Sequence, residues 1–189
     1  MNENFSCPTS LPPAEAAQAL CELSNQSSLE LLPLKSNIKK LDWMEPGVEV
    51  FITFLPLNPE KPYEEEIERR MRMSLNTAEA ARNHGLKPVM HVPARAFDSV
   101  ARLERFIGEA RDRAKVESAL ILAGDYAAPR CTELENSLDI LKTDVLRQNY
   151  YRNLYAAAHP EGFYSRVSRL HISQNELDPF IIAKRDYAQ

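Results

Sequence analysis

Residues 118–125 read Ser-Ala-Leu-Ile-Leu-Ala-Gly-Asp, and this stretch decides the fold class. Five apolar residues follow one another without polar alternation, and Gly124-Asp125 ends the run. Such a run is typical of a strand that is covered on both faces. Segments with helical spacing of apolar residues lie on either side, at 100–110 and 134–145. The stretch therefore predicts one strand of a parallel sheet covered by helices.

The same alternation extends outward in both directions along the chain. Short β-branched, aromatic or leucine-rich runs predict further strands, and apolar residues every three or four positions predict helices. Asp98 or Ser99 is expected to cap one of these helices, and Gly85 to end another. The remaining strands are predicted at 29–32, 48–54, 88–92 and 154–158, and the remaining helices at 14–23, 37–43, 63–83 and from 177 to the end.

The spacing of the strand ends favours an α/β barrel. These ends fall near Glu30, Thr53, His91, Asp125 and Ala157, which are 23 to 38 residues apart. A (βα)8 barrel of the TIM type uses about 30 residues per unit. We expect an incomplete barrel that covers about strands 1 to 5, with a tail and helix at 1–27 and a partial barrel domain at 28–189.

A doubly wound five-stranded sheet is the alternative fold. It would call for a glycine-rich phosphate-binding turn after the first strand. The turn here, Leu-Pro-Leu-Lys-Ser-Asn at 32–37, contains no glycine. The sequence therefore favours the barrel without excluding the doubly wound sheet.

Composition excludes several classes of protein. The chain is 44% hydrophobic and 26% charged with a net charge of −4, which predicts a globular protein without a basic surface for nucleic acid. It has no apolar run of about 18 residues, so no membrane span is expected. Cys7, Cys21 and Cys131 are widely spaced, which predicts neither a disulfide framework nor a metal site. A reduced, cytoplasmic protein without a secretory signal is the expectation.

In a barrel, functional side chains collect at the carboxyl ends of the strands. Polar residues stand at these ends along the whole chain, namely Glu30, Thr53, His91, Asp125 and His159. Any one of them alone is more often a loop-capping or otherwise structural residue. Because five strands each supply one to the same expected rim, we interpret the set as a candidate site.

Six short segments, taken in order, carry a family resemblance. They are Ser-Leu-Glu-Leu-Leu-Pro at 28–33, Val-Phe-Ile-Thr at 50–53, Met-His-Val-Pro-Ala-Arg at 90–95, Leu-Ala-Gly-Asp at 122–125, Ser-Leu-Asp-Ile-Leu at 137–141 and Ala-Ala-His-Pro-Glu-Gly at 157–162. From residue 28 to 189 the chain resembles the methylenetetrahydrofolate reductases. No single segment is decisive, and the order and spacing carry the resemblance.

The resemblance implies non-covalently bound FAD and the reduction of 5,10-methylenetetrahydrofolate to 5-methyltetrahydrofolate with NAD(P)H, in one-carbon and methionine metabolism. It implies that Glu30 is the general acid and that Asp125 lies near the flavin and the pterin and tunes the hydride step. The cofactor-binding residues that it implies are Thr53, His91, Leu122, Ala123, Gly124, Asp125, Ser137, Ala157, His159 and Lys184.

Departures from the family pattern keep other functions open. Ala123 stands where the family usually has arginine, and Asn136 where it has tyrosine, so FAD is expected to bind differently or more weakly. The chain is expected to end before the sixth strand, so activity of this short chain alone is in doubt. A truncated non-catalytic barrel and a flavin-free, pterin-binding methyltransferase-like barrel are the alternatives. Homo-oligomerisation and the choice between NADH and NADPH stay open.

Overall fold

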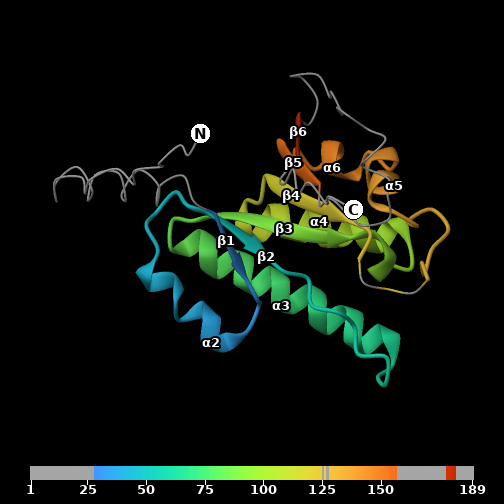
Figure 1. Ribbon diagram of the computed structural model, residues 1–189, viewed down its shortest axis with the longest axis horizontal. Coiled ribbons are helices and arrows are strands. Elements are labelled where there is room, and N and C mark those ends of the chain that lie inside the picture. Colours follow the sequence, from blue (N-terminus) through green and yellow to red (C-terminus); the bar gives the residue numbers. More distant parts are fainter. Residues whose placement is uncertain (1–27, 125, 127, 157–177, 182–189) are drawn as a thin grey trace, which may run out of the picture.

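A computed structural model describes residues 28–124, 126, 128–156 and 178–181. Strands and helices alternate along this part of the chain (Figure 1). The strands are β1 (Ser28–Leu31), β2 (Glu49–Ile52), β3 (Lys87–Pro93), β4 (Ser118–Leu122), β5 (Asn153–Ala156) and β6 (Asp178–Ile181). The helices are α2 (Lys35–Ile38), α3 (Tyr63–Asn83), α4 (Val100–Ala114), α5 (Ser137–Lys142) and α6 (Val145–Gln148), with the 3₁₀ turns η1 (Leu41–Trp43) and η2 (Ala94–Ala96).

All six strands are parallel and form one sheet in the order of the sequence, β1-β2-β3-β4-β5-β6. The five predicted strands are confirmed, each within a few residues at its ends. A doubly wound sheet reverses its strand order at a switch point. No such reversal occurs among the described strands, so the alternative winding does not fit this sheet.

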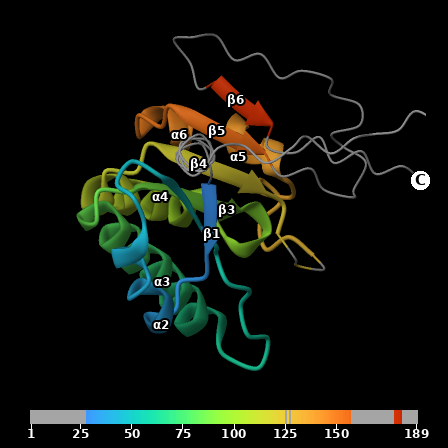
Figure 2. The same cartoon turned by 60° about the vertical axis from the view of Figure 1, so that its left-hand side comes forward.

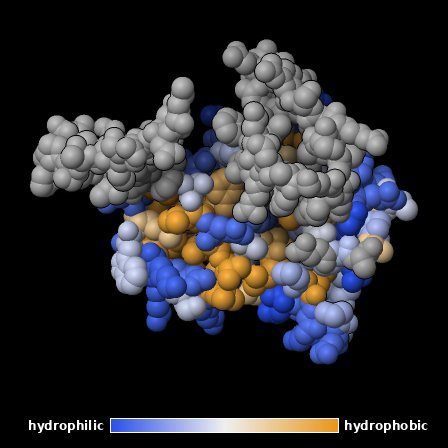
Figure 3. All heavy atoms as spheres, in the orientation of Figure 1, coloured by the Kyte–Doolittle hydropathy of each residue, from blue (hydrophilic) through white to orange (hydrophobic). Residues whose placement is uncertain are grey.

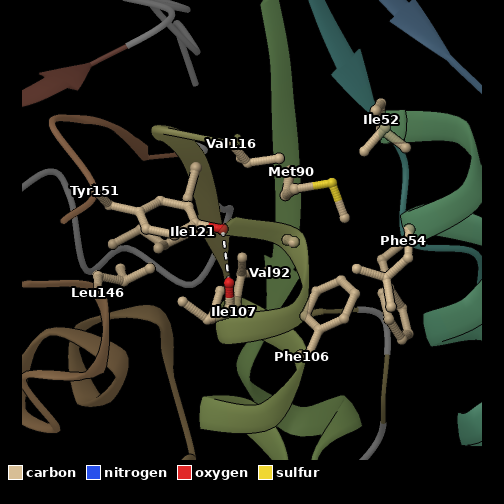
Figure 4. Packing of buried hydrophobic residues seen from close by; sticks show 14 of the residues in the cluster. Ile52, Phe54, Met90, Val92, Phe106, Ile107, Val116, Ile121, Leu146 and Tyr151 are labelled. Carbon is tan, nitrogen blue, oxygen red and sulfur yellow. Dashed lines mark hydrogen bonds between the residues drawn. The ribbon is translucent and has the colours of Figure 1, made fainter. Parts of the chain in front are cut away.

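The main hydrophobic core lies on one face of the sheet. Alternate strand residues such as Ile52, Met90 and Ile121 point to this face and join the apolar sides of α3 and α4 in one buried cluster. Figure 2 shows α3 and α4 on the same side of the sheet. Within the core, the Tyr151 hydroxyl donates to the carbonyl oxygen of Ile107 in α4 at 3.3 Å (Figure 4). The opposite face of the sheet is therefore where a site can form.

Helices α3 and α4 are joined across their outer sides by ion pairs. Arg102 donates to Glu64 at 2.8 Å and Arg113 to Glu79 at 2.7 Å, and Arg105 pairs with Glu68 between them. Exposed pairs contribute little individually, but three in a row favour one register between the two helices. This register fixes the loops that lead from β2 to α3 and from β3 to α4.

The predicted helix from 177 to the end is wrong over residues 178–181, which form β6. Strand β6 is therefore added to the five strands that the sequence predicted. Residues 178–181 read Asp-Pro-Phe-Ile, and proline and β-branched residues favour an extended backbone over a helix. Pairing with β5, in which Leu154 aligns with Pro179, supplies the hydrogen bonds that local sequence cannot reveal. The outer edge of β5 is therefore covered.

Two shorter helices differ from the predictions in length. The expected helix at 37–43 is split between the four-residue α2 and the turn η1. The expected helix at 134–145 is split between α5 and α6, because Asp144 between them has a left-handed backbone, φ 58°. The expected helix at 14–23 lies outside the described residues. In contrast, α3 has the predicted bounds, and Ser99 caps α4 by accepting from the Arg102 N–H as predicted.

At one edge of the sheet, β1 has no outer neighbour among the described strands. Leu29, Leu32 and Leu34 are correspondingly exposed. Figure 3 shows hydrophobic residues gathered across the middle of the visible face, with hydrophilic residues around them.

Cys131 is a free thiol. Among the described residues, no helix has the length and hydropathy needed to cross a membrane.

Candidate functional site

The sheet face opposite the described helices carries three of the predicted site residues near its carboxyl edge. The Thr53 hydroxyl donates to Oε1 of Glu30 at 3.0 Å. The backbone N–H of Thr53 donates to the Leu31 carbonyl at 3.1 Å, which continues the pairing of β1 with β2 and fixes the position of Thr53. The register pairs Ile52 with Met90, so the next residues, Thr53 and His91, lie beside each other on neighbouring strands. Glu30, Thr53 and His91 are thus brought together.

His91 is almost completely buried in this site, with 8% of its surface exposed. Its Nε2 has no hydrogen-bond partner among the described residues. Burial lowers the pKa of His91 to about 4, and the negative charge of Glu30 opposes that shift only in part. The imidazole is therefore uncharged near neutral pH, and its unpaired nitrogen suits an uncharged hydrogen-bonding group better than a phosphate.

Two aromatic residues, Phe51 and Tyr155, lie near His91 on the same face. The ring of Phe51 contacts the His91 ring edge to face, with the ring centres 6.3 Å apart. The Tyr155 ring contacts Phe51 in the same manner at 5.1 Å. The Tyr155 hydroxyl lies 2.8 Å from both carboxylate oxygens of Glu49. Burial, followed by the hydrogen bond to Glu49, raises the pKa of Tyr155, so its hydroxyl keeps its proton and donates.

The contact between Tyr155 and Glu49 shows that the sheet curves toward this face. The two residues are three strands apart, which is about 14 Å in a flat sheet. Register places Tyr155 level with His91 and Thr53, and Glu49 lies four residues before Thr53, about 13 Å along the strand. The resulting separation of about 19 Å in a flat sheet exceeds the reach of these two side chains. Curvature must therefore bring β5 toward β2.

Leu122, Ala123 and Gly124 lie at the end of β4, and their contact with a flavin stays a prediction. Gly124 has φ +92°, and a Cβ there would lie 2.9 Å from the Pro93 side chain and 3.0 Å from the Tyr126 ring. The glycine is thus required by its own backbone and by neighbouring residues of the chain, whatever ligand binds. The Ala123 carbonyl accepts the Arg95 N–H at 3.0 Å, which ties the ends of β3 and β4 together.

Arg95 has a positioning role that the sequence did not single out. Its Nε donates to the Glu135 carbonyl at 2.8 Å, and another guanidinium nitrogen donates to the Tyr126 carbonyl at 3.3 Å. The side chain therefore links the loop after β3 to the loop after β4. The signal available in the sequence was its place two residues beyond Pro93, at a strand end.

Ser137 is buried in the first turn of α5, where the resemblance implied a pyrophosphate. The Asn136 side chain accepts the Leu138 N–H at 3.0 Å, and Asp139 accepts the N–H groups of Glu135 and Asn136. This capping box already uses the N–H groups that an anion would need, and it places a carboxylate beside them. The contact of Ser137 with a pyrophosphate stays a prediction, and the capping weighs against it.

Four of the predicted site residues, Asp125, Ala157, His159 and Lys184, lie outside the described residues. Within the described part of the chain, no three His, Cys, Asp or Glu side chains are grouped to hold a metal ion. Sequence reasoning also missed Phe51, Tyr155 and Glu49. Strand alternation could have found the first two, since each lies two residues before a predicted strand end and so shares its face.

The chain matches no protein-family model and no curated protein. The chemistry of the face formed by Glu30, Thr53 and His91 is therefore the basis for assigning a function.

Proposed function

We propose that this chain forms part of a (βα)8 barrel that reduces 5,10-methylenetetrahydrofolate to 5-methyltetrahydrofolate through FAD and NAD(P)H. Six parallel strands in sequential order, with helices on one face and curvature toward the other, support the barrel. The family resemblance of the motifs supports the chemistry. The proposed substrate-binding face is the one that carries Glu30, Thr53 and His91.

The observation that carries the proposal is the hydrogen bond from Thr53 to Glu30 at the carboxyl edge of the sheet. Glu30 is exposed, and a flat ligand on this face would remove it from water. Removal from water favours the protonated carboxyl group, which is the form that a general acid needs. Thr53 holds Oε1, so the other oxygen can deliver the proton to a folate nitrogen as the five-membered ring opens.

The described residues fit a flavin in part. The buried Nε2 of His91 suits a ring N–H or a ribityl hydroxyl, because the imidazole is uncharged and the nitrogen has no other partner in the described chain. Ala123 offers no charge to a phosphate. When bound, the flavin would take a hydride from the nicotinamide and pass it to the folate. The protein's own contribution is to orient the ligands and to supply the proton from Glu30.

Separate measurement of the two half-reactions tests the proposal. FAD binding is followed by the quenching of flavin fluorescence, and flavin reduction by NAD(P)H and reoxidation by the folate are followed by stopped flow. Glu30→Gln should leave reduction unchanged, because hydride transfer to flavin needs no acid here. Reoxidation should fall by about 10²–10⁴-fold, the usual contribution of a general acid.

Glu60→Gln is the matched control, since Glu60 is an exposed carboxylate in the loop after β2. It should leave both half-reactions unchanged. Equal reoxidation rates in Glu30→Gln and the parent protein would remove Glu30 from the mechanism. Folate binding without any FAD binding would replace the proposal with the flavin-free pterin-binding barrel.

A further inference from the structure

The contact between Tyr155 and Glu49 joins two strands that are not neighbours. Glu49 opens β2 and Tyr155 lies in β5, so the hydrogen bond passes across β3 and β4 on the curved face. Both oxygens of the carboxylate lie at 2.8 Å from the hydroxyl. Neither residue belongs to the six segments that carry the family resemblance, and the proposed reaction gives neither of them a task.

A chain of ring contacts leads from this hydrogen bond to the candidate site. Tyr155 contacts Phe51 and Phe51 contacts His91, each edge to face. Phe51 and Val89 are buried on this face, which is opposite the face that the described helices cover. Among the described residues, the ring of Tyr155 packs against Phe51 from across the curved face.

We propose that Tyr155 is a positioning residue. Glu49 holds its hydroxyl, and its ring fixes Phe51 against His91 and keeps water from the side of the imidazole that Phe51 contacts. Nε2 of His91 is thereby presented to an uncharged hydrogen-bonding group of the ligand. The inference uses the assignment of His91 to the site, but it does not depend on which ligand binds there. Among the described residues, Glu30 in β1 is the charged group that acts on His91, and Leu120 is its nonpolar neighbour in β4.

Histidine NMR tests the inference directly on the intact chain. With ¹⁵N-labelled histidine, long-range proton–nitrogen correlations report the protonation of each of the four histidines, and His91→Gln assigns the signal. In the parent protein His91 should stay neutral from about pH 5 to 8, unlike an exposed histidine with a pKa of about 6.5. Tyr155→Phe keeps the ring and removes the hydroxyl. The titration midpoint of His91 should then rise by at least about 1 pH unit, because water reaches the imidazole.

Three further variants make the test decisive. Glu49→Ala removes the acceptor from the other end and should raise the His91 midpoint in the same way, including if Tyr155→Phe fails to fold. Glu49→Gln keeps an acceptor oxygen and should restore parent behaviour. Tyr150→Phe removes a hydroxyl that belongs to a 72% exposed residue and should change nothing.

An unchanged His91 midpoint in folded Tyr155→Phe or in Glu49→Ala would overturn the inference. So would a Glu49→Gln protein whose His91 midpoint rises as far as in Glu49→Ala, because an acceptor oxygen at position 49 would then not be what holds Tyr155 in place. None of these readings uses FAD or folate, so failure of the proposed reaction and failure of this inference are distinguishable.

Discussion

His84 Nε2 lies 2.8 Å from Oδ1 of Asp42, while Nδ1 of the same ring lies 2.7 Å from the Ala80 carbonyl oxygen. Both ring nitrogens thus face acceptors, and both can donate only when the imidazole is protonated. The Ala80 carbonyl and then Asp42 raise the pKa of His84 above 6.5. The contact joins the carboxyl end of α3 to η1.

This arrangement predicts a small loss of stability at alkaline pH. Because the folded-state pKa is raised, the stabilisation is complete below about pH 6.5 and is lost as the pH rises through the folded-state value. His84 is partly exposed, so the effect should not exceed about 1 kcal/mol. Urea unfolding at a series of pH values should show the loss in the parent protein and not in His84→Gln. Equal pH dependence in the two proteins would contradict the assignment.

The pKa of Glu66 is lowered, so we expect the chain to lose stability in acid. It is fully buried near the start of α3, and its hydrogen bonds with Arg69, assisted by the Asn58 N–H and the charge of Arg70, lower its pKa from 4.5 to about 2. A lowered pKa means that the stabilisation is present above pH 4.5 and is lost as the pH falls toward 2. Acid unfolding followed by circular dichroism should therefore be less steep in Glu66→Gln.

Replacing Glu66 by leucine is a stronger change. It leaves the guanidinium of Arg70, which is mostly buried, without its carboxylate. Breaking a buried pair on one side costs about 3–5 kcal/mol. If the free energy of unfolding of Glu66→Leu fell by less than about 1 kcal/mol, Arg70 would have to be hydrogen-bonded to water or to another acceptor.

Gly124 and Gly47 form a matched pair for testing the loop after β4. Both have a left-handed backbone, φ +92° and +89°, but a Cβ at Gly47 would meet nothing within 4 Å. Gly47→Ala should therefore report backbone strain alone, about 1 kcal/mol. Gly124→Ala adds the clash with Pro93 and should cost about 1–3 kcal/mol more. Equal losses in thermal unfolding would mean that the Pro93 contact relaxes freely.

Thr53 provides a graded test of how Glu30 is held. Thr53→Val keeps the shape and removes the donor, whereas Thr53→Ser keeps the hydroxyl. We expect Thr53→Val to slow folate-dependent flavin reoxidation while Thr53→Ser retains most of it. Because the pair is exposed, the free energy of unfolding should change by less than about 1 kcal/mol. Indistinguishable reoxidation rates in the two variants would show that Glu30 needs no partner.

Much of the fold could be predicted from local sequence. The bounds of α3 follow from apolar spacing between Pro62 and Gly85, and the cap of α4 follows from Ser99, because these features act over a few residues. Of the five predicted strands, β2 to β5 are largely buried, whereas β1 at the edge of the sheet is mostly exposed. The grouping of Glu30, Thr53 and His91 also followed, since parallel strands bring their carboxyl ends to one edge.

The sequence by itself thus determined five of the six described strands and the bounds of α3, and which residues share an edge of the sheet. Only the tertiary structure decided that residues 178–181 pair with β5 instead of forming a helix, because that choice depends on hydrogen bonds to a distant strand. It also decided that Tyr155 forms a hydrogen bond with Glu49, 106 residues away in the sequence. Burial in the folded chain lowers the pKa of His91, so that its imidazole is uncharged near neutral pH. Curvature and burial arise from the whole sheet, and no local pattern encodes them.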